Sequence, residues 1–210
     1  LSYVLAVGEE AKAMLGRTPE DIVAVRPLRK GVIESIAQAE ALLVYAIDKG
    51  SGEKTDNIDR IVIGIPGDAS EVEKRAVRDS AEHAGAKEVY LLSEPMAAAI
   101  GIGLDVSSPV GNMIIDIGGG TTEIAVISLS GIANGQSIRI AGDELNTAIV
   151  EYFRKNYNIL IGERTAEDIK CQVGSVMPLK EEVIIEVKGR DLVSGLPKMT
   201  EVSAIEIRES

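Results

Sequence analysis

Three adjacent glycines between two apolar runs form the part of the sequence best suited to chemistry. In the stretch IIDIGGGTTEIAV, residues 114–126, a carboxylate ends the first run and two threonines follow the glycines. Glycine leaves backbone amides without a shielding Cβ, so an anion can approach them directly, and threonine hydroxyls add further donors. Magnesium prefers few protein carboxylates and keeps its waters, so an acidic side chain here can hold that ion through water. The residues concerned are Asp116, Gly118, Gly119, Gly120, Thr121 and Thr122.

A plain glycine-rich hairpin explains the same residues without a ligand. In that interpretation Asp116 caps the turn, and the threonines simply favour the strand that follows. The joint presence of two apolar arms, an acidic strand end and three glycines favours phosphate binding instead. The stretch lacks the Gly-Lys-Ser/Thr ending of a Walker A loop, and no helix follows the glycines as in a Rossmann fingerprint. These two classes of nucleotide site are therefore disfavoured.

The elements that position these residues follow from hydrophobic periodicity and from turn-forming residues. Strands or extended segments are predicted over residues 3–8, 20–27, 60–66, 88–93, 111–117, 122–129 and 137–140, and a hairpin over 183–203. Helices are predicted over residues 9–16, 34–49, 145–153 and 165–174, and another begins at a capping box of Ser70 and Glu73 and ends at Gly85.

Strands alternate with helices in the first half of the chain, and hairpins dominate the second half. This order predicts an α/β fold, with a mixed sheet, helices on its faces and small appended subdomains. In open α/β sheets, ligands bind beyond the ends of the strands. The glycines at the end of the predicted strand 111–117 lie at such a place.

Glu94 lies at a second strand end, where the run EVYLLS changes to a helix. Pro95, directly after it, has the fixed φ that suits the first position of a helix. A carboxylate there can cap the helix, favoured by the positive end of its dipole, and it can also accept a proton from water. The two roles are compatible, so Glu94 is a candidate for both.

Composition narrows the class of protein. The chain has 210 residues, of which 45% are hydrophobic, which is enough to bury a core in one or two domains. Its net charge of -11, without clustered Lys and Arg, argues against nucleic acid as a partner. A single cysteine, without a Cys/His cluster, argues against disulfides and zinc and favours a reducing cytoplasm. This residue, Cys171, falls in a helical pattern, and we expect a buried apolar side chain.

Neither a spanning helix nor a signal peptide is predicted. The sequence has no run of about 18 apolar residues and no charged start followed by an apolar segment. The chain begins at Leu1, inside an apolar run and without a methionine, so we expect it to be part of a longer protein.

Four stretches together resemble the MreB family, the rod-shape-determining bacterial homologues of actin, within the superfamily of actin, Hsp70 and sugar kinases. They are LLSEPMAAAIGIGL (91–104), MIIDIGGGTTEIAVISL (113–129), IRIAGDELNTAIVEY (138–152) and IGERTAEDIK (161–170). The glycine stretch alone would indicate only the superfamily, whereas EPMAAAIG together with GERTAE is typical of MreB-like proteins. The resemblance extends along essentially the whole chain, and it implies an actin-like ATPase fold, related to ribonuclease H, with two lobes.

The resemblance implies that ATP binds with magnesium in a cleft between two lobes. Gly118, Gly119, Gly120 and Thr121 would then form the second phosphate-binding hairpin, with Asp116 near the magnesium ion. Glu94 and Thr121 match the family residues that orient the attacking water, and Thr122 is their neighbour. A carboxylate that accepts a proton while a hydroxyl fixes the direction of the water is what in-line phosphoryl transfer requires.

Two further segments match the nucleotide site of the family. Gly142 and Asp143 begin a helix whose amides can face the ligand, although ordinary capping explains them equally well. The segment with Glu167, Asp168, Ile169 and Lys170 would line the adenosine side, or Glu167 and Lys170 could form only a surface ion pair worth ~0.3 kcal/mol. Position 172 is Gln where the family has an acidic residue that meets the nucleotide sugar, and a neutral amide can still form a hydrogen bond.

The resemblance also implies four subdomains and an incomplete nucleotide site. Residues 1–28 would belong to subdomain IB, 29–108 to IA, 109–144 to the first part of IIA, and 145–210 to IIB and its exit. The first phosphate strand of the family would precede residue 1, and its adenine loop would follow residue 210. We therefore expect a weak ATPase in the complete protein and little or no activity in this chain alone.

Partners and function follow from the same resemblance. It implies a head-to-tail filament of copies of this protein that directs cell shape, with the cell-wall elongation machinery as a further partner. The filaments would lie in the cytoplasm, at the cell periphery. The segment GSGEKTDNID, residues 50–59, is polar where an apolar membrane loop would be expected, so direct lipid binding is not supported. A sugar-kinase-like enzyme and a non-catalytic actin-fold binding module are the alternatives.

Overall fold

The computed structural model describes residues 4–29, 31–51 and 58–210, which form two compact units. Unit 1 comprises residues 1–139, and unit 2 comprises residues 140–210. Each unit has its own hydrophobic core, so each is described by itself. None of the helices in these ranges combines the length and the apolar content needed to cross a bilayer.

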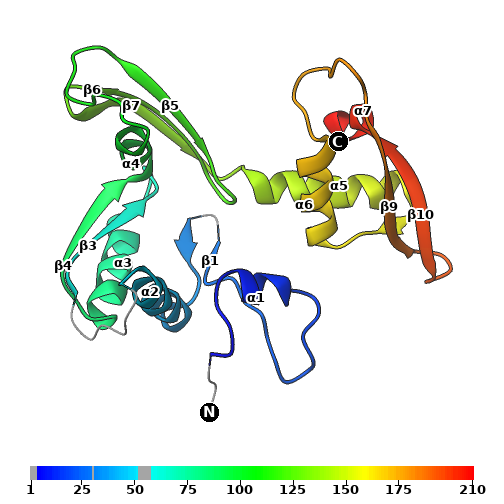
Figure 1. Ribbon diagram of the computed structural model, residues 1–210, viewed down its shortest axis with the longest axis horizontal. Helices are drawn as coiled ribbons and strands as arrows, with labels where there is room; N and C mark the ends of the chain where they lie inside the picture. Colours follow the sequence, from blue (N-terminus) through cyan, green and yellow to red (C-terminus); the bar gives the residue numbers. More distant parts are fainter. Residues whose placement is uncertain (1–3, 30, 52–57) are drawn as a thin grey trace. The chain divides into compact units, whose positions relative to one another are not determined.

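Unit 1 is built from two sheets, a short hairpin and four helices within the described residues (Figure 1). Its elements are α1 (Glu9–Ala13), β1 (Leu28–Arg29), β2 (Val32–Ile33), α2 (Ile36–Ser51), β3 (Ile58–Ile65), α3 (Glu71–His83), β4 (Ala86–Ser93), α4 (Glu94–Gly101), β5 (Asn112–Ile117), β6 (Thr122–Ser128) and β7 (Gly131–Ile138).

The first sheet is a parallel pair, β3 and β4, connected through α3. The sequence starts α3 firmly, because the Ser70 hydroxyl accepts from the Glu73 amide while the Glu73 carboxylate accepts from the Ser70 amide at 2.7 Å. Gly85, with φ of +102°, ends the helical segment and turns the chain into β4. The parallel pairing places Ser93, at the end of β4, beside Ile65, at the end of β3. Glu94 and the segment after β3 thus leave the same edge of the sheet.

The second sheet is an antiparallel meander, β5–β6–β7, with α4 against one face. Its side chains alternate, as the period of a strand requires. The inner face forms a core with α4, made of Met96, Ala99, Ile114, Ala125 and Ile127. The opposite face carries exposed apolar side chains of β5, namely Met113, Ile115 and Ile117. Asp116 and Glu123 are paired across β5 and β6, and Ser137 is paired with Glu123 from β7.

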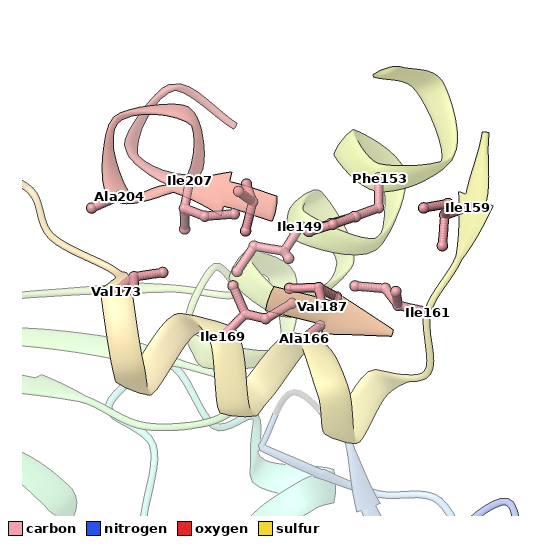
Figure 2. Close-up of a cluster of buried hydrophobic side chains, with 11 residues drawn as sticks. Ile149, Phe153, Ile159, Ile161, Ala166, Ile169, Val173, Val187, Ala204 and Ile207 are labelled. Carbon is pink, nitrogen blue, oxygen red and sulfur yellow. The ribbon is translucent and has the colours of Figure 1, made fainter. Parts of the chain in front are cut away.

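Unit 2 packs three helices against a small antiparallel sheet of order β10–β9–β8. Its elements are α5 (Gly142–Tyr157), β8 (Ile159–Leu160), α6 (Glu163–Val173), β9 (Ile184–Asp191), β10 (Pro197–Ser203) and α7 (Ala204–Glu209). Figure 2 shows side chains of α5, α6, α7 and the strands that meet in one core, with Phe153 fully buried. Asn158, with φ of 55°, ends α5 in the left-handed conformation that asparagine tolerates.

α7, a helix of six residues, is held by one carboxylate that serves two elements. Glu206 closes a capping box with Ser203 at the start of α7, and it also accepts hydrogen bonds from the Tyr157 and Tyr152 hydroxyls of α5. The bond to Glu206 and burial together raise the pKa of Tyr157 to about 12. The end of the unit is therefore tied to α5 by polar contacts as well as by its core.

Several sequence predictions need correction. The apolar run at residues 4–7 forms no strand, and no strand of the described residues pairs with it. The third strand of the meander begins at Gly131, well before residue 137, and β1, β2, β8 and α7 were not predicted. Cys171 is exposed, because its position on α6 faces away from the core that Ile169 and Val173 enter. Most of the polar segment 50–59 lies outside the described residues.

Candidate functional site

The glycine turn, residues 118–121, joins β5 to β6 and is closed by one hydrogen bond. The Gly118 amide donates to the Thr121 carbonyl at 2.9 Å. None of the three glycines has a left-handed φ, and a Cβ added at Gly118 would lie 3.4 Å from its nearest neighbour, the Thr121 carbonyl oxygen. The fold itself therefore does not require glycine at position 118, and the missing side chain instead leaves the backbone accessible.

Two amides of the glycine turn remain available to a ligand. The amides of Gly119 and Gly120 donate no hydrogen bond to a backbone carbonyl of any residue that the structure describes. Gly118 and Gly119 are exposed, and Gly120 and Thr121 are half-buried. Free amides in a bend without side chains can surround an anionic oxygen, as phosphate-binding loops do. The predicted phosphate turn therefore has the donors that this role needs.

Segments far apart in the sequence contact the glycine turn within unit 1. Gly31, directly before β2, has a φ of +74°, and a Cβ there would lie 2.8 Å from Pro66 Cγ and 3.3 Å from Thr121 Cγ2. Glycine is required here, because both the left-handed φ and the close approach exclude a side chain. Pro66, which follows β3, and Thr121 are thus held close to the same point.

Glu94 begins α4 at the end of β4, next to the end of β3. A Cβ added at Gly64 of β3 would lie 3.4 Å from Glu94 Cγ. Burial, and then the negative charges of Glu123 and Asp116, raise the pKa of the half-buried Glu94 carboxyl. A raised pKa makes a carboxylate a stronger proton acceptor, as a general base requires. The buried Pro95 fixes the chain directly after it.

Glu123 is a site residue that sequence reasoning did not find. It is only 2% exposed, and its carboxylate accepts hydrogen bonds from the Gly67 amide at 3.0 Å and from the Ser137 hydroxyl. The strand alternation of the sequence could have identified it, because Glu123 lies on the same inward face of β6 as Ala125 and Ile127. A charge at a buried strand position is costly unless it is hydrogen-bonded, and so it points to a special environment.

Asp116 lies at the end of β5, half-buried and directly opposite Glu123. Across the described ranges, no group of three or more acidic, histidine or cysteine side chains is arranged to hold a metal. The residues at the glycine turn thus offer one carboxylate of β5 rather than a protein cage. This donor set fits magnesium, which keeps several waters and binds through one or two carboxylates and substrate phosphates.

In unit 2, a polar network joins the start of α5 to α6. Lys170 donates to the Gly142 carbonyl at 3.2 Å and to the Glu167 carboxylate at 2.8 Å. Asn146, which is 3% exposed, donates to Glu167 at 2.6 Å. These bonds, first from Lys170 and then from Asn146, lower the pKa of Glu167 to about 2. Gly142, Glu167 and Lys170 are thus brought together, as one site would need.

The remaining predicted residues of unit 2 are Asp143, Asp168 and Ile169. The Ile169 side chain is 3% exposed and belongs to the hydrophobic core, so only its backbone can meet a ligand. The Asp168 side chain is exposed on α6. Asp143 lies in the first turn of α5, and its carbonyl accepts from the Thr147 hydroxyl at 2.9 Å. α5 has no side-chain cap, because Ala141 is its N-cap residue.

Comparison with known proteins covers the whole chain. A sequence model described as MreB/Mbl protein matches residues 1–210. The cell shape-determining protein Mbl of Bacillus cereus is 47% identical over 207 residues, which are 99% of this chain and 62% of that protein. The cell shape-determining protein MreB of Escherichia coli is 49% identical over 208 residues, which are 99% of this chain and 60% of that protein. The chain therefore spans about 60% of the length of these curated relatives.

Solved structures agree with this result. MreB5 of Spiroplasma citri, solved with ADP and with AMPPNP, matches with a TM-score of 0.90 and 38% identity over 98% of this chain and 61% or 62% of that chain. MamK, solved as a double helical filament, matches with a TM-score of 0.76 and 23% identity over 97% of this chain and 61% of that chain. At 23% identity the likeness to MamK shows the fold alone. The predicted fold class, an incomplete actin-like α/β fold, is confirmed.

Proposed function

Because this chain belongs to the MreB/Mbl protein family, we propose that it is part of a nucleotide-dependent, actin-like cytoskeletal protein. In this proposal the complete protein assembles head to tail into filaments that direct cell shape and cell-wall synthesis, and it hydrolyses ATP slowly. The relatives named cell shape-determining proteins and the nucleotides bound to MreB5 support it.

One observation of this chain carries the nucleotide part of the proposal. The glycine turn keeps the Gly119 and Gly120 amides free, and Thr121 and the half-buried Glu94 belong to the same unit. The free amides would bind phosphate oxygens, and backbone donors do so without the reorganisation that flexible side chains need. A plain hairpin also leaves the amides at the centre of its turn unpaired, but it does not explain the half-buried Glu94 carboxyl, whose pKa burial and the charges of Glu123 and Asp116 raise.

The chemical step would depend mainly on positioning. The Glu94 carboxylate would accept a proton from the attacking water, while the Thr121 hydroxyl, with Thr122 beside it, would fix the direction of attack. Asp116 would hold magnesium through water, and the ion would neutralise charge on the phosphates. The raised pKa of Glu94 suits the acceptor role, and burial limits the freedom of its side chain.

In unit 2, the segment with Glu167 and Lys170 would meet the nucleoside. The bonds from Lys170 and Asn146 hold Glu167 in its ionised form with one side chain conformation, which is useful for accepting hydrogen bonds from sugar hydroxyls. Gln172 would supply a neutral amide in the same region. Gly142 and Asp143, at the uncapped start of α5, would add backbone amides for an anion, and Asp168 and Ile169 would contribute through their backbone.

The proposed partners follow from the proposed filament. A second copy of the complete protein is the main partner, and the cell-wall elongation machinery is a further one, in the cytoplasm near the cell periphery. The net charge of -11 does not favour nucleic acid. Direct lipid binding is not part of the proposal.

Phosphate release by the full-length protein, measured together with light scattering, tests this function. With magnesium and ATP we expect both signals, and we expect the E94A variant to release phosphate ~100-fold more slowly with nearly unchanged nucleotide affinity. The E88A variant, which removes an exposed carboxylate of β4, serves as the control. Turnover that requires a sugar would instead indicate a kinase. If the protein shows no turnover and no assembly, it is a binding module.

A further inference from the structure

Glu123 is the charged side chain that the fold of unit 1 buries most completely among the described residues. With only 2% of its surface exposed, the carboxylate has exchanged water for two neutral donors, the Gly67 amide and the Ser137 hydroxyl. Burying a carboxylate costs free energy that neutral hydrogen bonds only partly offset. An apolar residue would occupy this inward-facing position of β6 at a lower free-energy cost. Stability alone therefore does not explain why a charged residue is buried there.

The two donors belong to elements that are separate from β6. Ser137 lies on β7, on the far side of β6 from β5, and Gly67 lies in the segment that follows β3. A Cβ added at Gly67 would lie 3.0 Å from the Glu123 carboxylate oxygen, so the backbone of this segment reaches Glu123 as closely as a glycine allows. Glu123 thus connects the parallel sheet to the meander.

The segment that Glu123 holds, residues 64–67, lies beside Glu94 and shares the neighbour Gly31 with Thr121. Gly64 approaches the Glu94 side chain, with 3.4 Å between its Cβ position and Glu94 Cγ. Pro66 lies against Gly31, and the Cβ position of Gly31 is also 3.3 Å from Thr121 Cγ2. A shift of this segment would therefore move the surroundings of Glu94 and of Thr121 together.

Arg139 adds a second tie directly after this segment. Its guanidinium lies 3.7 Å from the Asp68 carboxylate and 3.7 Å from that of Glu73, at the start of α3. These groups are partly exposed, so this tie is weak by itself. The bond from Gly67 ends on the Glu123 carboxylate, which is only 2% exposed, so water competes with it less than with these ion pairs.

We propose that Glu123 is a positioning residue for ATP hydrolysis: by accepting from Gly67 and Ser137 it holds residues 64–67 beside Glu94 and against Gly31, the neighbour of Thr121. This assignment rests on the proposed function, because it concerns the rate of the reaction proposed there. Glu123 does not itself need to touch the nucleotide or the water. Misplacing reacting groups by about 1 Å can cost ~100-fold in rate, so a residue that acts at this distance can control turnover.

The test uses the full-length protein and compares E123A, E123Q and S137A with the wild type. In E123A we expect kcat to fall ~10-fold or more, with the KM for ATP and the affinity for a fluorescent ATP analogue changed less than about twofold. In E123Q the amide oxygen can still accept from Gly67 and the amide NH2 can donate to Ser137, so we expect most of the rate to return. S137A removes one of the two bonds, and an intermediate kcat is expected.

A second readout is independent of nucleotide. Hydrogen exchange of the Gly67 amide, measured in the nucleotide-free protein, should accelerate in E123A and stay close to the wild type in E123Q. S137A leaves the Gly67 bond in place, so the protection of this amide should persist there. The E88A variant should change neither readout.

The possible outcomes distinguish the proposed role of Glu123 from the proposed ATP hydrolysis. A wild-type protein without ATP hydrolysis would remove both proposals. Hydrolysis by the wild type, with an unchanged kcat in E123A or with E123Q as slow as E123A, would overturn only the role of Glu123. If E123A does not fold, the kcat of S137A is compared with that of the wild type. Equal values would overturn the proposed role of Glu123.

Discussion

At the scale of single residues, Gly118 separates what the fold needs from what a ligand needs. Its φ is not left-handed, and a Cβ would meet only ordinary contact at 3.4 Å. We therefore expect G118A to change the free energy of unfolding by no more than ~0.5 kcal/mol. We also expect it to weaken nucleotide binding by the full-length protein ~10-fold, because a methyl group would stand beside the free amides. Denaturant unfolding and titration with a fluorescent ATP analogue measure the two effects.

Gly189 provides the matched control for that substitution. A Cβ there would lie 2.2 Å from Ile159 Cγ2 and 2.8 Å from the Leu160 carbonyl oxygen, so β9 and β8 would have to separate. We expect G189A to cost ~1–3 kcal/mol of unfolding free energy. Equal losses of stability in G118A and G189A would contradict the conclusion that glycine at position 118 serves a ligand.

Glu167 makes the stability of unit 2 depend on pH. Its folded pKa of about 2 lies below the ordinary 4.5, so the ionised form contributes stability above pH 4.5, and this contribution is lost as the pH falls toward 2. We expect the wild type to lose more unfolding free energy between pH 5 and about 2.5 than E167Q does. Urea unfolding across this range measures the difference, with the exposed-site variant E201Q as the control. Parallel curves for the wild type and E167Q would refute the expectation.

At the scale of elements, the start of α3 depends on two reciprocal hydrogen bonds. Ser70 and Glu73 satisfy each other's backbone amides, which otherwise have no partner in the first turn. We expect S70A to lower the free energy of unfolding by about 1 kcal/mol, and S70T to retain most of the stability because its hydroxyl can cap as well. Thermal unfolding of both variants checks this order, and equal effects would show that the cap contributes little.

Elements with local signals could be predicted from the sequence. The capping box and Gly85 gave α3, Pro95 gave the start of α4, and the two apolar arms around the glycines gave β5 and β6. Elements that depend on distant partners could not be predicted. The run at residues 4–7 has the composition of a strand but finds no partner strand among the described residues, whereas the two-residue β8 exists because β9 pairs with it.

The candidate site divides in the same way. Residue types and spacing marked the glycine turn, whereas the roles of Glu94 and of the segment with Glu167 and Lys170 were implied by the family resemblance and remain predictions. Glu123 was missed, because its importance comes from Gly67, which is 56 residues away, and from Ser137 on another strand. The exposure of Cys171 was missed as well, since periodicity alone did not show which side of α6 would meet the core.

At the scale of the whole molecule, the two units have separate cores. Phe153 is fully buried in the core of unit 2, and Met96 lies in the core that α4 forms with the meander. We expect F153A to cost ~3–5 kcal/mol and M96A ~2–5 kcal/mol of unfolding free energy, each confined to its own unit. Scanning calorimetry of residues 1–210 should then show each substitution lowering a different transition. One transition shifted by both substitutions would mean that the units unfold as one.

The outer face of the meander has a practical consequence for handling this segment. One row of exposed apolar side chains runs along β5, formed by Met113, Ile115 and Ile117. An exposed apolar patch of this kind binds other apolar surfaces in water. We expect residues 1–210, purified alone, to bind to phenyl resin and to increase the fluorescence of the dye ANS. A charged residue at position 115 should reduce both effects.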